Sequence, residues 1–194
     1  MDERYDREQV EGFSFVRETY DWVESAVMAF VAMILVLTFV ARMVSVEGAS
    51  MENTLHENDR LISSNLFYKP KYGDIVVVVF LEHAERPLIK RVIATGGQVV
   101  DIDFETGVVM VDGEVLDEPY IAEPTNLQYD IIFPVLVPQG HVFVMGDNRN
   151  HSWDSRDSEI GMVDERNLLG RVVYRVMPFD KMGLPSSVYQ GKNR

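Results

Sequence analysis

Residues 25–41 form an uninterrupted apolar run, SAVMAFVAMILVLTFVA, without a charged side chain. The surrounding segment 23–42 contains twenty residues. As a helix it would rise about 30 Å, which matches the hydrocarbon core of a bilayer. Glu24 and Arg42 would lie at the two interfaces, where Arg42 can extend its charge toward water, and Trp22 would lie in the interfacial aromatic belt. The run therefore predicts a single transmembrane helix over 23–42.

A buried core helix and a cleavable signal peptide are the alternatives to this anchor. A core helix of such uniform apolarity would need a larger protein around it than 194 residues provide. A signal peptide begins with a basic segment and has a shorter apolar run, whereas residues 1–24 contain eight acidic residues against three arginines. We therefore expect a permanent anchor preceded by an acidic segment over 1–22. Basic residues are balanced at the two ends of the run, so they do not set its orientation.

Residues 43–194 follow the anchor and are numerous enough to bury a core of their own. They contain short apolar segments separated by turn residues such as Gly-Gly and Asp-Gly, a pattern typical of β-strands. Strands are expected at 74–80, 88–94, 99–104, 108–112, 141–145 and 171–177. The pattern predicts a mainly β fold with a β-barrel-like or folded-sandwich domain. Within it, residues 103–138 are expected to form a small inserted β-ribbon and residues 179–194 a loose tail.

Composition excludes several classes of function. The net charge is −13, which argues against nucleic acid as a partner because binding to phosphates needs a basic surface. The chain has no cysteine, so thiol nucleophiles, disulfides and thiolate zinc sites are excluded. Its four histidines lack the spacing of a metal-binding pair. We expect neither a metal nor another cofactor.

Ser50 follows the apolar run closely, in the segment VEGASMENTL. Gly48 and Ala49 leave the backbone around it uncrowded, as a nucleophile approached by a peptide requires. An ordinary turn is the alternative, because Gly-x-Ser is common in turns and the G-x-S-x-G elbow is interrupted by Glu52.

Lys90 lies in the predicted strand PLIKRVIA among apolar neighbours. Alternation along a strand places Leu88, Lys90 and Val92 on one face. Burial lowers the pKa of a lysine, and a lysine that acts as a base near neutral pH needs a shift of about 2–3 units. A lysine that extends to water or pairs with an acid is the alternative.

The segment GDNRNHSWDSR, after the apolar strand HVFVM, is dense in Asp, Asn, Arg and Ser. Such a segment can be a solvated turn or a loop held in place by ion pairs. Asp147 and Asp154 can pair with Arg91 and Arg156, which would fix the strand that carries the lysine. A hydroxyl such as that of Ser152 could hold the lysine amine in place.

Together these segments resemble the signature motifs of type I signal peptidases, which remove signal peptides from exported preproteins. The motifs are Ser-Met-x-x-Thr-Leu, Gly-Asp-Ile-Val, Lys-Arg-Val-Ile and Gly-Asp-Asn-Arg followed by Ser-x-Asp-Ser-Arg, in family order over most of residues 43–178. The resemblance implies Ser50 as nucleophile, Lys90 as general base and Ser152 as the hydroxyl that orients the base. It also implies a single-pass protein of the cell membrane, with the N-terminus inside and the catalytic domain on the extracytoplasmic side.

The resemblance further implies the supporting ion pairs Asp147–Arg91 and Asp154–Arg156, and preprotein signal peptides and membrane lipid as partners. The substrate is expected to lie extended beside residues 44–48 and 87–90 and to be cut after small residues of the Ala-x-Ala type. The side chains expected to line its pockets are Val44, Val46, Met51, Leu55, Leu88 and Ile89.

One departure from the family concerns the oxyanion hole. Gram-negative members carry a serine hydroxyl donor two residues before the nucleophile, where this chain has Gly48. The hole would then depend on the backbone N–H of Ser50, with or without water, and one such donor can contribute about 3–4 kcal/mol. Two further departures are Asn53, which replaces the proline usual before Thr54 and so affects the rigidity of the loop but no catalytic atom, and the segment 95–98, which replaces the usual Pro-Gly-Asp ending.

Two other functions fit the same residues. The first is a related Ser/Lys peptidase with a dedicated substrate, such as a self-cleaving repressor-type, pilin or conjugation peptidase. The second is a membrane-tethered β domain that binds extended peptides without cleaving them. The presence of every expected catalytic side chain disfavours the second.

Overall fold

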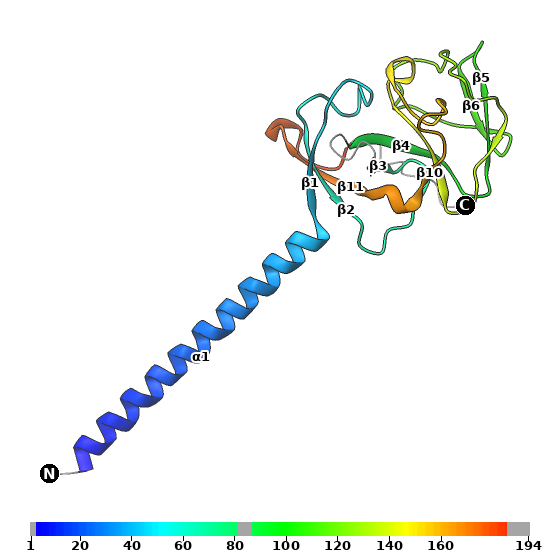
Figure 1. The fold of residues 1–194 in the computed structure, drawn as a ribbon. Helices are drawn as coiled ribbons and strands as arrows, with labels where there is room; N and C mark the ends of the chain where they lie inside the picture. Colours follow the sequence, from blue (N-terminus) through cyan, green and yellow to red (C-terminus); the bar gives the residue numbers. More distant parts are fainter. Residues whose placement is uncertain (1–2, 81–86, 186–194) are drawn as a thin grey trace. The chain divides into compact units, whose positions relative to one another are not determined.

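The computed structural model describes residues 3–80 and 87–185 and divides the chain into two compact units, residues 1–40 and 41–194. The first unit is one helix, α1 (Glu3–Val40), drawn in blue in Figure 1. It begins within the acidic segment 1–22, because the Glu, Arg and Gln side chains there are good helix formers.

The helix side chains described over residues 17–35 are all exposed, and several of them are large and apolar. In the part of the chain that the structure describes, no helix combines the length and the hydropathy of a membrane span. The transmembrane helix expected over 23–42 therefore stays a prediction, and its expected end is two residues too late, since α1 ends at Val40 and Arg42 begins a strand.

The second unit is mainly β and is built on a curled, antiparallel half-barrel sheet of seven strands in the order β1-β2-β11-β3-β4-β9-β10 (Figure 1). These strands are β1 (Arg42–Ser45), β2 (Arg60–Ser64), β3 (Ile75–Val78), β4 (Leu88–Thr95), β9 (His141–Met145), β10 (Val163–Asp164) and β11 (Leu168–Met177). Register shifts interrupt the pairing of β11 with both of its neighbours and the pairing of β4 with β9. Such bulges increase strand twist, which helps a sheet to curl.

A second sheet of four strands, in the order β7-β6-β5-β8, occupies the region predicted as an inserted ribbon. Its strands are β5 (Val99–Asp103), β6 (Val108–Val111), β7 (Glu114–Val115) and β8 (Val135–Leu136). The insertion thus starts before residue 103 and is a small sheet. The short strands β7 and β8 have no periodicity from which the sequence could predict them.

The expected strands 88–94, 99–104, 108–112 and 141–145 correspond closely to β4, β5, β6 and β9. Strands β1 and β2 differ from the expected set, because each has only four or five residues and many of these are exposed or polar. The segment expected as a loose tail folds back as far as Gly183, which bridges to Arg175 in β11. Residues 186–194 of that tail lie outside the described residues.

Strand β3 is buried along its whole length, since it lies between β11 and β4 and both of its faces meet apolar clusters. On one face Ile75 and Val77 join the cluster Val44, Val46, Met51, Leu55, Leu61, Ile89 and Val172. On the other face Val76 and Val78 join the cluster Val92, Val142, Val144, Ile160, Val163 and Leu168. A third cluster, which includes Ile93, Val100 and Phe143, joins the two sheets. This double burial explains the continuous apolar sequence IVVVV.

Glycine at position 170 is required by the close approach of β11 to β2. Gly170 has φ +151, and a Cβ there would lie 2.6 Å from the carbonyl carbon of Ser64. Gly183 has a similar φ, +140, but a Cβ there would meet nothing within 4 Å.

We expect Gly170→Ala to lower the free energy of unfolding by about 1–3 kcal/mol more than Gly183→Ala, because only Gly170→Ala adds overpacking to backbone strain. Urea unfolding of both variants tests this, and equal losses would contradict it.

Candidate active site

Ser50 lies in the loop that connects β1 to β2, and its side chain is partly exposed. The residues after it hold this loop in the core, since Met51 is 1% exposed and Leu55 is fully buried in the first cluster. The Leu55 N–H also donates to the Met51 carbonyl at 2.9 Å. The serine is thus presented at the surface by a loop whose neighbouring side chains are buried.

Lys90 lies in β4, between β3 and β9, and is 3% exposed. Its Nζ donates to Ser50 Oγ at 2.8 Å and to the carbonyl oxygen of Ile89 at 3.2 Å. The fold therefore brings together the two residues that the sequence analysis selected as nucleophile and base, which are separated by forty positions in the chain.

The environment of the Lys90 amine favours its neutral form. Burial lowers the pKa of Lys90 to about 8, because the ammonium loses its hydration while the amine does not. The negative charges of Asp154 and Asp147 oppose this shift, and the positive charge of Arg156 supports it. Burial outweighs the two carboxylates.

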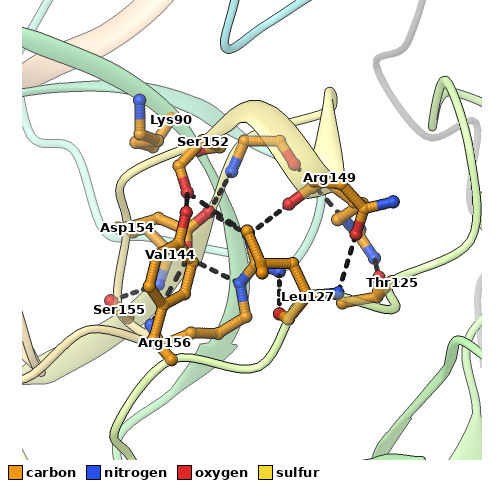
Figure 2. A network of polar contacts seen from close by, with 12 residues as sticks. Lys90, Thr125, Leu127, Val144, Arg149, Ser152, Asp154, Ser155 and Arg156 are labelled. Carbon is orange, nitrogen blue, oxygen red and sulfur yellow. Dashed lines mark hydrogen bonds and ion pairs between the residues drawn. The ribbon is translucent and has the colours of Figure 1, made fainter. Parts of the chain in front are cut away.

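Both expected ion pairs are present. Arg91 Nε and Nη2 donate to the two carboxylate oxygens of Asp147 at 2.7 and 2.6 Å, and both side chains are fully buried. Thr54 Oγ1 donates to the same carboxylate at 2.5 Å, so Asp147 connects the Ser50 loop to the residue after Lys90. Asp154 accepts from Arg156 Nε at 2.9 Å and from Nη2 at 3.0 Å (Figure 2).

Ser152 is buried beside the same residues, but it does not make the expected hydrogen bond to Lys90. Its hydroxyl oxygen has no hydrogen-bond partner among the described residues. A Cβ on Gly146 would lie 2.2 Å from Ser152 Oγ and 2.4 Å from the carbonyl oxygen of Ser50, so only glycine fits between them. The hydroxyl therefore packs closely against the backbone of Gly146. The Lys90 amine instead contacts Ser50 and the carbonyl of Ile89.

Five of the six expected pocket residues share the first apolar cluster; they are Val44, Val46, Met51, Leu55 and Ile89. All five are buried, with at most 7% of each residue exposed. The sixth, Leu88, packs against the cluster on the other face of β3. The reason is the alternation of β4, which directs Leu88 and Ile89 to opposite faces.

A second layer of polar residues, which was not expected from the sequence, supports the site. Arg149 is fully buried and donates to both carboxylate oxygens of Glu118, to Thr125 Oγ1 and to the Gly146 carbonyl. The ring of Tyr120 lies 4.0 Å from the Arg91 guanidinium and 6.0 Å from that of Arg149. No local spacing indicates these contacts, because Glu118 and Arg149 are 31 positions apart.

Asn148 is a further residue that the sequence analysis left without a role. It directly follows Asp147, and it donates hydrogen bonds to the carbonyl oxygens of both Ala49 and Ser50. Its place in the Gly-Asp-Asn-Arg motif was the signal that could have indicated it. Among residues 3–80 and 87–185, no group of three or more His, Asp or Glu side chains is arranged to hold a metal ion.

This arrangement, a serine hydroxyl against a buried lysine amine on a half-barrel sheet, is that of a serine peptidase. The sequence model of the family described as "Signal peptidase, peptidase S26" matches residues 19–177. The chain belongs to this family.

Curated relatives of this chain are described as signal peptidases I. A probable signal peptidase I-2 of Synechocystis sp. is 38% identical over 174 residues, which cover 84% of this chain and 77% of the relative. The signal peptidase I of Mycobacterium tuberculosis is 33% identical over 229 residues, which cover 88% and 78%. A crystal structure of a signal peptidase I from Enterococcus faecalis is 27% identical, with a TM-score of 0.45 over 54% of this chain and 97% of that one.

The chain therefore functions as a signal peptidase I, a serine peptidase of family S26 whose substrates are signal peptides. Signal peptidase I is a membrane-associated enzyme.

We expect Asp147→Asn to lower the free energy of unfolding by about 3–5 kcal/mol, because it leaves the buried Arg91 charge uncompensated. Asp164→Asn is the matched control, since Asp164 pairs with Arg166, whose side chain is 89% exposed. This control should change stability little, because water screens such a pair. Urea unfolding measures both variants, and a similar small effect for both would show that the Arg91–Asp147 pair is dispensable.

Proposed function

We propose that Ser50 is the nucleophile and Lys90 the general base of a Ser/Lys endopeptidase that cuts preproteins after small residues of the Ala-x-Ala type. The observation that carries this proposal is the 2.8 Å contact between Lys90 Nζ and Ser50 Oγ. With the amine neutral, the serine hydroxyl becomes the donor in this contact and the amine lone pair the acceptor. That is the geometry from which a base removes a proton.

The lowered pKa supplies enough of the neutral base. At pH 7 a lysine with a pKa of about 8 is neutral in about one molecule in ten. A lysine with the ordinary pKa is neutral in about one molecule in three thousand. Burial thus raises the population of competent base by about 300-fold, without any histidine or metal ion.

The reaction proceeds through an acyl-enzyme. Lys90 accepts the Ser50 proton while Ser50 Oγ forms a bond to the scissile carbonyl carbon. The resulting lysinium protonates the leaving amine as the C–N bond breaks. Lys90, neutral again, then takes a proton from a water molecule that attacks the ester carbonyl. The ester bond breaks, and the lysinium returns its proton to Ser50.

The proposed substrate binds as an added strand next to the nucleophile. β1 is the edge strand of the large sheet and pairs only with β2 among the described strands. In β4, pairing with β9 begins at Arg91, so among the described strands residues 88–90 pair with β3 alone. Two unpaired backbone edges therefore flank Ser50. Leu88 would contact the substrate through its main chain, since its side chain packs in another cluster.

Small side chains suit this site because the proposed pocket residues are already closely packed. Met51 and Leu55 are at most 1% exposed, and they share their cluster with Val44, Val46 and Ile89. Only shallow depressions over such a cluster would be open to the substrate. We infer that alanine fits at the first and third positions before the cut.

The pH dependence of cleavage tests the assignment of the base. We expect kcat/KM on a preprotein with an Ala-x-Ala site to rise with pH through an apparent pKa of about 8, because only neutral Lys90 can accept the Ser50 proton. Ser50→Ala and Lys90→Met should abolish cleavage. Robust cleavage by Lys90→Met would refute the Ser/Lys mechanism.

The stability of Lys90→Met provides the control for folding. Below its folded pKa of about 8, Lys90 is charged in the folded protein, and burial of this charge lowers the free energy of unfolding. This destabilisation is largest at low pH and disappears as pH rises through the pKa of Lys90 in the unfolded chain. The variant lacks this destabilisation. At pH 6 it should be at least as stable as the wild type, which separates loss of chemistry from loss of fold.

We also propose that residues 23–42 anchor the enzyme in the cell membrane by a single pass, with lipid as partner and the catalytic domain on the extracytoplasmic side. In support, large apolar side chains are exposed along the described part of α1; the exposed fractions of Val23, Val27, Met28, Phe30, Val31, Met33, Ile34 and Leu35 are 45–64%. A continuous apolar surface of this kind needs to be covered by something apolar.

Carbonate extraction of membranes tests this anchor. The double variant Phe30→Lys, Ile34→Lys should move the protein from the pellet to the supernatant, because each lysine costs about 3 kcal/mol in the apolar core of a bilayer. Ile132→Lys with Leu136→Lys is the matched control at exposed positions of the catalytic domain, and it should stay in the pellet. Retention of the helix variant in the pellet would contradict the anchor.

A further inference from the structure

Asn148 contacts both peptide groups that flank the proposed nucleophile. Its side-chain Nδ2 donates to the carbonyl oxygen of Ala49 at 3.1 Å, and its backbone N–H donates to the carbonyl oxygen of Ser50 at 3.0 Å. The Ala49 carbonyl also accepts from the Glu52 N–H at 3.1 Å. Both lone pairs of the Ala49 carbonyl are thereby used.

The contact with Ala49 fixes the direction of the Ser50 N–H. A trans peptide is planar, with its C=O and N–H pointing in opposite directions, and the cis peptides of the described chain lie elsewhere. Donors that hold the Ala49 carbonyl therefore also hold the Ser50 N–H on the far side of the same plane. Within the described residues, this N–H donates to no protein acceptor. It is available to a substrate oxygen.

This direction matters because the site lacks a hydroxyl donor at position 48. Gly48 contributes no side chain, so no hydroxyl at this position can assist the Ser50 N–H as a donor. Hydrogen bonds to the C=O of a peptide polarise it and strengthen its N–H as a donor. The two bonds to Ala49 thus both aim and strengthen the Ser50 N–H.

Asn148 is itself held rigidly. Its neighbours Asp147 and Arg149 are fully buried and form two-point ion pairs with Arg91 and Glu118. Its own carbonyl accepts from the His151 N–H at 3.0 Å, which starts the short helix η2 (Arg149–His151). The amide therefore reaches the Ser50 loop from a fixed support.

We propose that Asn148 is a positioning residue of the oxyanion hole, which orients the Ala49–Ser50 peptide so that the Ser50 N–H meets the developing oxyanion. The proposal rests on Ser50 being the nucleophile. An aspartate of the same shape would not serve, because a carboxylate cannot donate to the Ala49 carbonyl and would repel it. The backbone hydrogen bond from residue 148 to the Ser50 carbonyl is kept when Asn148 is replaced by aspartate or alanine. Such substitutions therefore test the side chain alone.

The test compares Asn148→Ala and Asn148→Asp with Asn150→Ala. Asn150 is a close match, since its amide also makes hydrogen bonds to backbone groups, with Asn126, Leu127 and Pro124, but none of them belongs to the Ser50 loop. We expect both Asn148 variants to lose about 10–100-fold in kcat with KM changed by less than about threefold, because an oxyanion donor acts mainly on the transition state. Asn150→Ala should retain kcat within about twofold.

A peptide aldehyde of the substrate sequence gives a readout that a merely structural role would not move. It adds to Ser50 as a hemiacetal, whose oxygen occupies the same place as the oxyanion. Its inhibition constant should rise in the Asn148 variants by about the factor lost in kcat/KM, while the pH at which activity rises stays unchanged. A non-covalent substrate analogue should bind as tightly as before.

The outcomes separate the two proposals. Full activity of Ser50→Ala would overturn the nucleophile assignment. An inactive Ser50→Ala together with Asn148→Ala within twofold of wild type would overturn the positioning role alone. Equal losses in Asn148→Ala and Asn150→Ala, with matching drops in melting temperature, would also overturn it, because the effect would then be one of folding.

Discussion

The carboxylate of Asp147 is the connection on which the geometry of the site depends. It accepts two hydrogen bonds from Arg91 and one from Thr54. Arg91 adjoins Lys90 in β4, and Thr54 lies four residues after Ser50, so one buried carboxylate sets the separation of Lys90 and Ser50. A buried ion pair contributes little net stability compared with apolar packing. Loss of one partner of the Arg91–Asp147 pair would, however, be costly. The pair therefore holds β4 and the Ser50 loop in one arrangement.

The ion pairs of Arg91 and Arg156 also help to keep the pKa of Lys90 low. The charges of Asp147 and Asp154 raise this pKa, and burial lowers it to about 8. Each carboxylate is held at two points by its own guanidinium, so neither needs the lysine as a partner. With the carboxylates uncompensated, the ammonium would be their natural counter-ion and Lys90 would stay protonated. The same ion pairs that fix the distances therefore keep the amine available.

The sequence predicted the parts of the site that lie in short motifs. Ser50, Lys90 and the Asp147–Arg91 and Asp154–Arg156 pairs follow from motif order, and strand β9 from its apolar run. The Arg149–Glu118 ion pair and the contact of the Arg149 guanidinium with the Tyr120 ring could not be predicted, because they join the segment after β7 to the loop after β9 across about 30 positions. The hydrogen bond expected from Ser152 is missing, and its hydroxyl oxygen instead packs closely against Gly146, a contact that no spacing in the sequence reveals. Likewise, the sequence did not show that the acidic segment 1–22 and the expected anchor share one helix, α1 (Glu3–Val40). Glu, Arg and Gln in the first part favour a helix about as well as Leu and Met do in the second.

Lys90 and Arg91, adjacent in β4, differ in what their side chains do, since Lys90 contacts Ser50 and Arg91 pairs with Asp147. The chemistry of the two side chains explains this difference. Alternation directs Lys90 and Arg91 to opposite faces of the strand, so the guanidinium can pair with Asp147 without occupying the place of the amine. An arginine stays protonated throughout the range in which the lysine titrates and offers the planar fork that a carboxylate accepts at two points. A lysine at position 91 would share its charge with Asp147 through a single flexible contact. The support of Lys90 would then be looser than its hydrogen bond to Ser50 requires.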